Sequence, residues 1–517
     1  MMNPKRRQLL ARSAALAAAA WLRPSLVTAQ PTARFKAYPF ALGVASGSPT
    51  SEGFVLWTRI APDPLAVSAM NPAPIAVQWE VAQDEKFAKV VKRGTVTAEA
   101  GHAHAVHVEV DGLEPARGYH YRFLAGGEAS AVGRTRTAPG PGPGHGDDKL
   151  RFAFASCQQF EQGWFNAYRP MVDDAPDLVV FLGDYIYESS WGRDHVRKHA
   201  STEPVTLDEY RDRYGQYKTD ADLQAAHAAC PWIVTWDDHE VDNDYADDRG
   251  EDLMADFLAR RTAAYRAFFE HHPLRRSVLT GGGMRIFDRH AWGSLALFHM
   301  LDDRQYRSWQ VCTKPNRGGS NVVGEDCTER LDPKLTLLGA EQERWLDEGL
   351  AQSKAKWNVI AQQTLMAPAG RMGPKGRVHW TDGWDGYPAA RQRLMDSLAA
   401  RKPANPVVIS GDVHASYVAN LRAQPERGDS PVVAAEFCGT SITSQGPDAK
   451  RVQALLDANP DVRFGEGSKR GYVLVNAKQD RMVVDYRVVE TVKVKDAKIS
   501  TLASFTVTGG KAGIVGS

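Results

Sequence analysis

The chain has 517 residues, of which 43% are hydrophobic and 24% charged, and its formal net charge is +1. This length allows a large hydrophobic core and predicts more than one domain. A net charge near zero gives no electrostatic reason to expect a nucleic-acid or anionic-membrane partner. The composition is that of an ordinary globular protein, which we expect to be a monomer.

The N-terminus has the pattern of an export signal. Residues 5–10, KRRQLL, contain twin arginines, an Ala/Leu-rich stretch follows, and residues 27–29, VTA, offer small side chains for cleavage. Arg12 and Arg23 interrupt the apolar run, which is too short to span a bilayer, so no stable membrane anchor is expected. A short amphipathic helix is the alternative. We predict a twin-arginine signal peptide over residues 1–29, recognised by the twin-arginine export machinery, and a periplasmic or secreted mature protein.

Residues 38–138 contain short alternating strands separated by turn residues. The runs 54–58, 75–80 and 105–110 are examples, and their close spacing predicts a small all-β sandwich of fibronectin-III type. Three histidines in this segment can be imagined as a metal cluster. Because strand alternation divides them between two faces, we interpret them as surface residues: His102, His104 and His107.

A Pro/Gly-rich segment at 139–149 cannot hold a helix or a central strand and predicts a linker. After it, apolar strands alternate with helical or loop segments, which predicts an α/β catalytic domain over 150–490 with two sheets or one large mixed sheet. Residues 491–517 are predicted as a C-terminal strand and tail. Helical spacing marks 255–270 and 339–350, and strands are expected at 151–157, 178–182, 232–236, 294–300, 358–361, 407–410, 431–437, 471–475 and 482–489.

Five of these apolar strands end in residues that can bind metal or act as acids and bases. Parallel strands deliver such residues to one edge of a sheet, where ligands bind in open α/β folds. One such ending is unremarkable, but five in order point to a site. The endings are Cys157, Asp184 with Tyr187, Asp238 with His239, Asp303 with Arg304, and Asp412 with His414.

The donor types predict two different cations. Asp184 is a carboxylate that can bridge two ions, and two cations about 3.5–4 Å apart can clamp both the attacking and the leaving oxygen of a displacement at phosphorus. Tyr187 and Cys157 need a strongly Lewis-acidic or soft ion to stay deprotonated, which favours ferric iron over magnesium. Asp238 and Asp412 are hard oxygen donors that suit calcium, magnesium or manganese.

The segments GDYIY (183–187), WDDHE (236–240) and GDVH (411–414) together resemble the calcineurin-like metallophosphoesterases and, more closely, the PhoD-type alkaline phosphatases. The stretch GVASGSPTSEGFVLWTRIAP at 43–62 resembles the N-terminal domain of that family, and the resemblance covers roughly residues 38–490. It implies a two-sheet α/β sandwich flanked by helices, like that of purple acid phosphatases, after a small all-β sandwich. The implied enzyme is an alkaline phosphatase, with or without phosphodiesterase activity, that serves phosphate acquisition.

The resemblance also implies residue roles. Asp184 would bridge the metals, Tyr187 and His414 would bind ferric iron, and Cys157 stands where the wider superfamily has an aspartate. Asp238 would hold the divalent ion together with Asp412. No histidine occurs in 358–364, where the wider superfamily has a metal ligand, so this site is oxygen-rich and fits calcium. We expect one Fe3+ and one or more Ca2+, with Mg2+, Mn2+ or Zn2+ as alternatives.

In the expected mechanism a metal-bound hydroxide attacks phosphorus in line. His239 stabilises the transition state or protonates the leaving group, and Arg304 is the candidate for neutralising charge on the phosphate oxygens. Asn243 can hydrogen-bond phosphate, although an ordinary loop asparagine is the alternative. The run 237–248 contains six aspartates, and we interpret all of these except Asp238 as a solvated loop.

Five cysteines leave one over after two bridges in an exported protein. Cys157 is assigned to metal, and Cys312 with Cys327 are the candidates for a local disulfide across a Gly/Asn-rich loop. Cys230 and Cys438 either pair with each other or remain buried free thiols.

Two other functions compete with the phosphoesterase. A two-metal lactonase or amidase usually relies on more histidines than this chain offers, and an inactive surface module predicts lost ligands, whereas the motif residues are intact. Phosphate monoesters, diesters and phospholipid or teichoic-acid-like substrates are all compatible with the sequence, because specificity is expected in the loops 189–229 and 368–387. Pocket walls or plain packing are alternative roles for four residues in these loops: Trp191, Arg193, Trp380 and Trp384.

Overall fold

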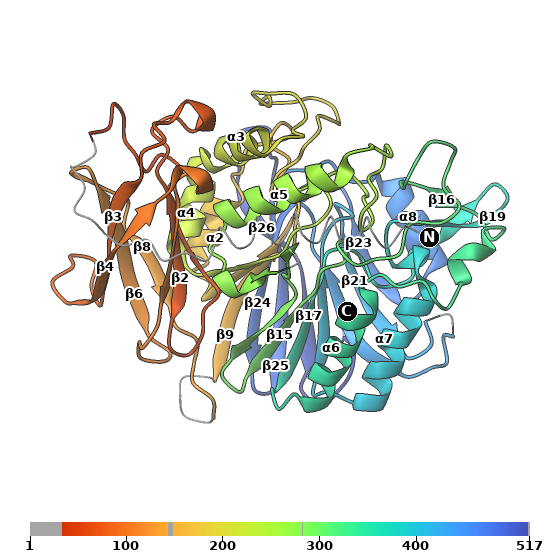
Figure 1. Ribbon diagram of the computed structural model, residues 1–517. Coiled ribbons are helices and arrows are strands. Elements are labelled where there is room, and N and C mark those ends of the chain that lie inside the picture. The colour runs from red at the N-terminus through yellow and green to blue at the C-terminus, as the bar shows by residue number, and fades with distance from the viewer. Residues whose placement is uncertain (1–33, 143–147, 282, 426, 515–517) are drawn as a thin grey trace.

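The computed structural model has two large β-sheets packed face to face, with helices on both outer faces (Figure 1). The predicted signal peptide lies outside the described residues, as does part of the Pro/Gly segment. No helix among the described residues has the length and apolar character needed to cross a membrane. The structure describes residues 34–142, 148–281, 283–425 and 427–514.

The first sheet has nine strands, and its centre is parallel. Residues of β9, β10 and β11 pair in parallel, as expected for short apolar runs that are buried on both faces. C-terminal strands extend one side of this centre, and N-terminal strands extend the other. In spatial order the strands are β26 (Ile499–Thr508), β25 (Arg481–Val489), β24 (Arg470–Lys478), β9 (Lys149–Ala155), β10 (Leu178–Phe181), β11 (Trp232–Val234), β1 (Val44–Gly47), β2 (Phe54–Arg59) and β5 (Ala105–Val110).

The second sheet has seven strands, of which β15, β17, β20 and β22 are parallel. Its inner face packs on the first sheet in one apolar core, where the rings of Phe152 and Phe298 meet edge to face at 5.2 Å. Each such buried phenylalanine stabilises the fold by about 1.5–3 kcal/mol. In spatial order the strands are β14 (Asp288–Trp292), β15 (Ala296–Met300), β17 (Trp357–Ala361), β20 (Pro406–Ser410), β22 (Val432–Cys438), β21 (Ser416–Arg422) and β23 (Val462–Glu466).

Helices cover the outer face of each sheet through apolar stripes. Tyr265, Phe268 and Phe269 of α5 are buried in the core under the first sheet and therefore pack the helix instead of lining a site. A capping box between Thr206 and Glu209 fixes the start of α3. The first sheet is covered by α2 (Tyr168–Asp173), α3 (Leu207–Lys218), α4 (Ala221–Ala229) and α5 (Phe257–His271), and the second by α6 (Gly339–Gln352), α7 (Pro388–Arg401) and α8 (Ala449–Ala458).

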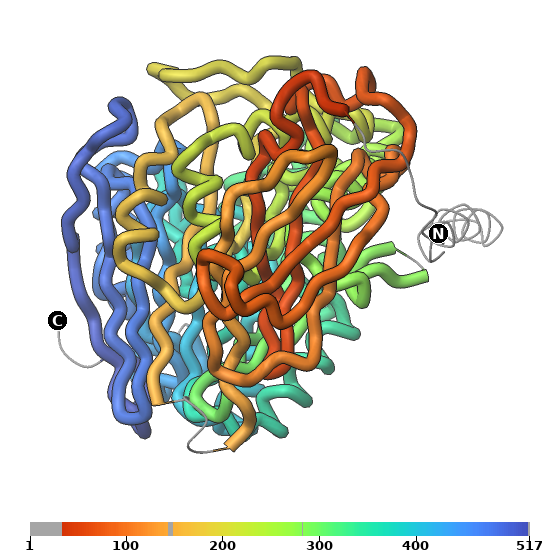
Figure 2. Tube along the Cα trace, turned by 90° about the vertical axis from the view of Figure 1, so that its left-hand side faces the viewer, coloured from red at the N-terminus to blue at the C-terminus, as the bar shows by residue number. Residues whose placement is uncertain are grey.

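The N-terminal region is all-β, as predicted, and it is continuous with the first sheet. A five-stranded sheet packs against β2 and β5, while β1 pairs in parallel with β11. In Figure 2 this region lies on the side of the molecule opposite to the C-terminal strands. The five strands are β3 (Ile75–Ala82), β4 (Val90–Ala98), β6 (Gly118–Ala125), β7 (Glu128–Ala129) and β8 (Gly133–Arg136).

One interpretation of the histidines was wrong. His104 is only 1% exposed, and its ring nitrogens lie 3.1 Å from the carbonyl oxygens of Ala98 and Asn71. Its backbone leaves the strand alternation, with a φ of 54° just before β5 begins. A turn therefore directs this side chain inward, which a strand pattern does not reveal.

Short strands and one disulfide complete the fold. Cys312 and Cys327 are bonded, as predicted, and Cys157, Cys230 and Cys438 are buried free thiols. The predicted alternative in which Cys230 pairs with Cys438 is therefore wrong. The short strands are β12 (Leu279–Thr280) with β13 (Gly283–Met284), and β16 (Val322–Val323) with β19 (Gly376–Trp380) and β18 (Arg371–Gly373).

Candidate active site

The strand endings predicted to form a site converge between the two sheets. Beyond β9, β10 and β11 lie Cys157, Asp184 and Asp238, and beyond β20 lie Asp412 and His414. Their donor atoms form groups within 4.8 Å of one another: Cys157–Asp184–His414, Asp184–Asp238–His239 and Asp237–Asp238–Asp412. Asp184 and Asp238 each belong to two of these groups, so one carboxylate can serve two neighbouring ions.

The backbone is bent sharply at these endings. Gly183 has a φ of 108°, and a Cβ added there would lie 2.5 Å from Cβ of Asp237. Only glycine fits this position. Cys157, Asp184, Asp412 and His414 also have positive φ values, of 60°, 56°, 64° and 53°. Such conformations cost of order 1–3 kcal/mol each for residues with a side chain and are concentrated at functional sites.

One half of the site combines a thiol, a phenol and an imidazole, and we call it the thiol–phenol half: Cys157, Tyr187 and His414 with the shared Asp184. The Tyr187 hydroxyl donates to Oδ2 of Asp184 at 2.7 Å and lies 3.1 Å from Nε2 of His414. Nδ1 of His414 lies 3.0 Å from the carbonyl oxygen of Gln445, which holds the proton on Nδ1 and directs Nε2 toward the site. Burial raises the pKa of both Cys157 and Tyr187. A nearby cation is therefore needed before either becomes an anionic ligand.

The other half, the carboxylate half, contains Asp238, Asp412 and the same Asp184. Each of these three aspartates has one carboxylate oxygen that is buried without a hydrogen-bond partner among the described residues: Oδ1 of Asp184, Oδ1 of Asp238 and Oδ2 of Asp412. Burial raises the pKa of Asp184 and Asp412. Burial also disfavours the charged form of Asp238, but the Arg304 and His239 charges outweigh it and lower the pKa of Asp238. Unpaired buried oxygens that converge on one point fit a hard cation.

Arg304 does not reach the cavity as predicted for a phosphate-binding arginine. It is 1% exposed, its Nε donates to Asp237, and its Nη1 donates to both oxygens of Asp382 at 2.8 Å. Its Nη2 lies 3.6 Å from Oδ1 of Asp238. This geometry holds the carboxylate half in place from behind. The neighbouring Asp303 belongs to none of the close donor groups among the described residues.

His239 and Asn243 both line the cavity. Nδ1 of His239 lies 2.7 Å from Oε2 of Glu188. Burial alone would lower the pKa of His239, but the carboxylates of Glu188, Asp238 and Asp184 together raise it well above its ordinary value. The side-chain amide of Asn243 donates through Nδ2 to Oε2 of Glu251 at 3.1 Å and to the Ser320 hydroxyl at 3.2 Å.

The interpretation of the acidic run as mostly solvated was wrong. Asp237, Asp242 and Asp244 are 1%, 7% and 6% exposed. The backbone N–H of Asp244 donates to Asp238 at 2.7 Å, so this segment folds back on its own carboxylates. Aspartates that accept backbone N–H groups favour turns over free loops.

Two buried glutamates that were not predicted from the sequence support the site. Oε2 of Glu240 accepts the backbone N–H groups of Asp184 and Asp237 at 3.0 and 2.8 Å, which ties two strand endings together. Glu188 orients His239. Both glutamates lie directly beside the recognised motifs, and this adjacency was the only local signal.

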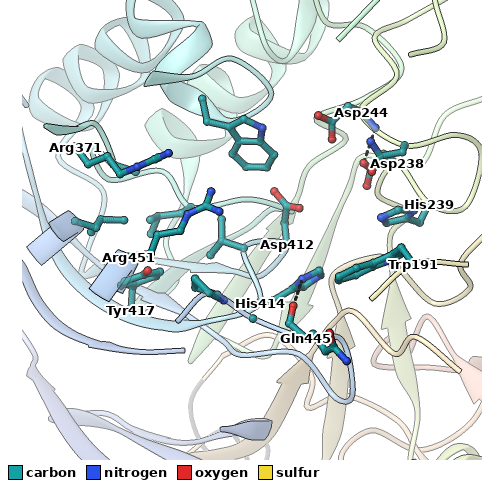
Figure 3. Close-up of a pocket in the computed structure, with 18 of the residues that line it drawn as sticks. Trp191, Asp238, His239, Asp244, Arg371, Asp412, His414, Tyr417, Gln445 and Arg451 are labelled. Atoms are coloured by element: carbon teal, nitrogen blue, oxygen red, sulfur yellow. Dashed lines mark hydrogen bonds between the residues drawn. The ribbon is translucent and has the colours of Figure 1, made fainter. Parts of the chain in front are cut away.

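A cavity of about 670 Å³ opens in front of these residues. Figure 3 shows Asp238, Asp244 and His239 on one side of it and Arg371 and Arg451 on the other. Trp191 and Trp380 also line it, which confirms them as pocket walls, whereas Trp384 is 1% exposed in the core. Arg193 is exposed and is not among the lining residues.

Comparison with known proteins agrees with this geometry. Residues 152–486 match the family model of the PhoD-like phosphatases, and residues 26–139 match that of their N-terminal domain. Alkaline phosphatase D of Bacillus subtilis (strain 168) is 45% identical over 494 residues, which cover 93% of this chain and 82% of that protein.

Two solved structures resemble the fold. One, described as the structure of PhoD, has a TM-score of 0.87 and 45% identity, and the match covers 93% of this chain and 94% of that chain. Purple acid phosphatase PPD1 from yellow lupin has a TM-score of 0.54 at 11% identity, over 90% of this chain and 74% of its own, and shows a shared fold alone. The chain therefore belongs to the PhoD-like phosphatase family, which makes it a hydrolase of phosphate esters.

Proposed function

We propose that the chain hydrolyses phosphate monoesters and diesters with two unlike cations, and that Asp184, which belongs to both donor groups, would be their shared ligand. Ferric iron would be held by Cys157, Tyr187 and His414 in the thiol–phenol half, and calcium by Asp238 and Asp412 in the carboxylate half. The observation that carries this proposal is the set of buried, unpaired carboxylate oxygens beside a thiol and a phenol of raised pKa. When bound, cations of these kinds supply Lewis acidity that activates water and neutralises phosphate charge.

The chain's own residues then act on protons and on position. His239 holds a proton because three carboxylates raise its pKa, and Glu188 fixes the ring through Nδ1. Nε2 of His239 is thus the donor for the leaving-group oxygen. Arg304 positions Asp238 and is not a substrate contact, while Asn243 contacts phosphate only if it exchanges its bonds to Glu251 and Ser320.

A leaving-group comparison tests the role of His239. Hydrolysis of p-nitrophenyl phosphate needs little proton donation, whereas an alkyl phosphate needs a full proton transfer to its alkoxide. We expect His239→Gln to reduce kcat for the alkyl ester by roughly 10²- to 10⁴-fold and that for the nitrophenyl ester far less. Equal losses on both esters would assign His239 to charge stabilisation instead.

Elemental analysis with a visible absorption spectrum tests the metals, on protein exported natively and purified without chelators. About one iron per chain, with calcium and a charge-transfer band, is expected. Zinc or manganese without a band would remove the proposed roles of Tyr187 and Cys157 while leaving the phosphoesterase in place.

We also propose export by the twin-arginine pathway to the periplasm or medium, a role in phosphate acquisition, and a monomeric state. Replacing Arg6 and Arg7 by lysines should retain the precursor in the cytoplasm, because the twin arginines are the recognised signal. Cell fractionation checks this, and unchanged export would contradict it. Light scattering of the purified protein checks the monomer.

A further inference from the structure

The cavity has two walls of opposite charge. Asp238, Asp244 and Asp412 line one side of the cavity, beside the candidate metal centre. Arg371 of β18 and Arg451 in the first turn of α8 line the cavity from another side (Figure 3). Figure 3 shows the two arginines together, across the cavity from His239 and Asp238. The metal centre accounts for the acidic wall and leaves the basic one unexplained.

These arginines lack the partners that other arginines around the site have. Arg304, Arg307 and Arg391 all bind aspartates. Within the described part of the chain, neither Arg371 nor Arg451 makes a salt bridge, and neither guanidinium makes a hydrogen bond. Asp448, the nearest acid along α8, uses its carboxylate to accept the backbone N–H of Arg451 at 2.8 Å.

The surroundings of Arg371 are unfavourable for a cation, whereas Arg451 is exposed to solvent. Partial burial, and then the charge of Arg451, lower the pKa of Arg371, so the two guanidiniums are close enough to repel. Arg451 also lies at the positive end of the α8 dipole, which disfavours a cation. An anion between the two side chains would relieve both effects, and arginine is well suited to bind phosphate or carboxylate.

We propose that Arg371 and Arg451 form a subsite for a second anionic group of the substrate, carried on the alcohol part of the ester. This inference rests on the proposed function, because it assumes that the scissile phosphate binds at the metal centre. The cavity also contains apolar side chains that suit a carbon chain between the two anions, including Leu365, Val413 and Leu455. The preferred substrates are therefore esters of alcohols that carry another phosphate or a carboxylate.

Matched substrates isolate this second group. Propane-1,3-diol monophosphate and its 1,3-bisphosphate differ only in the second phosphate, and butane- and hexanediol homologues vary the spacing. We expect the wild-type, metal-loaded protein to favour one bisphosphate by roughly 10- to 100-fold in kcat/KM, beyond the statistical factor of about two for its two ends. An ω-carboxylate analogue tells whether the subsite takes carboxylate as well as phosphate.

Three variants test the residues. In Arg371→Gln/Arg451→Gln the preference for the bisphosphate should fall to the statistical factor, while kcat/KM for the monophosphate stays within about twofold. Unchanged monophosphate turnover also shows that the double variant folds. Arg463→Gln is the control, because Arg463 is an exposed arginine on the neighbouring β23 and does not line the cavity; it should keep the preference.

Three results would overturn the proposal. Equal losses on the monophosphate and the bisphosphate would mean that the arginines contact the scissile phosphate itself. An unchanged preference in the double variant would mean that no subsite exists, and an equal effect of Arg463→Gln would mean that only the overall charge matters.

Calorimetry separates this proposal from the proposed function. Propane-1,3-bisphosphonate cannot be hydrolysed, and its Kd is compared with that of propylphosphonate on the same metal-loaded protein. Tighter binding of the bisphosphonate that is lost in the double variant supports the subsite even if no ester is turned over. Equal Kd values for the two phosphonates in the wild type would contradict it even if turnover is fast.

Discussion

Two buried polar clusters lie on either side of the segment 183–187. Asp184 and Tyr187 face the candidate metal centre, whereas the Tyr185 side chain faces a second cluster, which we call the imidazole cluster: Lys218, His227, His271 and His272. The Tyr185 hydroxyl lies 2.8 Å from Nε2 of His227, and Lys218 Nζ lies 5.0 Å from the centroid of the Tyr185 ring. Both clusters are rich in groups that can bind metal or titrate.

The clusters differ in what surrounds their polar atoms. In the centre, unpaired carboxylate oxygens converge beside a cavity. In the imidazole cluster, Nδ1 of His271 and Nδ1 of His272 are bonded to backbone carbonyls at 2.6 and 2.9 Å, and the His227 ring stacks on Trp232 at 3.9 Å. Nδ1 of His227 and Nε2 of His272 also lack a hydrogen-bond partner among the described residues, but they are neutral ring nitrogens packed in the core and do not converge on open space. None of its four residues lines the described cavity. Burial of polar groups therefore does not identify a site; unpaired atoms of one charge that face open space do.

The largest expected effect is that of Asp184→Asn, because this residue is shared by both halves of the centre. Loss of the bridging charge should reduce kcat/KM by on the order of 10³-fold or more and lower the content of both metals. Stability should not suffer: without metal, Asp184 is a buried carboxylic acid of raised pKa, and an amide of equal size replaces it. Activity, elemental analysis and thermal unfolding of chelated protein measure these quantities.

His271→Gln is the counterpart in the imidazole cluster. It breaks contacts with Arg59 and Ala267 and should cost about 1–3 kcal/mol of stability while leaving metal content and kcat/KM unchanged. If Asp184→Asn kept its metals and activity, or if His271→Gln lost them, the contrast between the two clusters would fail.

Arg304→Gln should combine both kinds of effect. Removing the guanidinium leaves Asp237 buried without its counter-ion and leaves Asp382 with Arg307 alone, which costs about 3–5 kcal/mol in urea unfolding. Because Arg304 also lies behind Asp238, calcium affinity should fall roughly 10- to 100-fold. The exposed Arg463→Gln should change stability by less than about 0.5 kcal/mol. A raised KM at unchanged calcium affinity would show that Arg304 contacts the substrate after all.

Cys157→Ser and Tyr187→Phe sharpen the division within the centre. Each removes one soft or phenolic donor from the thiol–phenol half and should abolish the visible band and lower iron content, while calcium in the carboxylate half remains. Activity should fall about 10- to 100-fold. Cys230→Ser is the matched control, because Cys230 is also a buried free thiol but belongs to none of the described donor groups. A band that persists in both variants would assign the chromophore elsewhere.

The sequence predicted the site residues correctly where an apolar strand pattern is followed directly by residues that can bind metal. An uninterrupted apolar run that ends in Gly183 and Asp184 favours a short buried strand, and parallel strands bring their ends to one edge, so the candidate metal ligands were predictable. Trp191 was predictable as a pocket wall for a weaker reason, namely that it lies in a loop next to a motif.

Other members of the site depend on contacts between distant segments. Ser444 donates to the Tyr187 hydroxyl at 2.8 Å across 257 positions, and Asp382 binds Arg304 across 78. No periodicity reports such pairs. The buried Asp237 and Asp244 were misinterpreted because a run of acids normally predicts solvent. Only the folded chain shows that Arg304 donates to the Asp237 carboxylate and the Ser320 hydroxyl to that of Asp244.

The last expected effect is a pH dependence of stability that comes from the imidazole cluster and leaves activity unchanged. Burial lowers the pKa of Lys218 from 10.5 to about 7, with its ammonium 4.3 Å from the centroid of the Trp57 ring. Between pH 7 and 10.5 the folded protein thus binds fewer protons than the unfolded chain, so this residue's contribution to stability rises with pH across that window, by about 1 kcal/mol per unit.

Lys218→Met should remove this slope, because methionine fills similar space without a charge to desolvate. Urea unfolding of both proteins at pH 7, 8, 9 and 10 measures the difference: the variant should be the more stable at pH 7, and the two should approach each other toward pH 10. Parallel curves would show that Lys218 keeps its charge in the fold. The unfolding experiments use chelated protein, because metal binding itself depends on pH. As a control, kcat/KM of the metal-loaded variant should match that of the wild type, because Lys218 packs against Tyr185 and does not line the cavity.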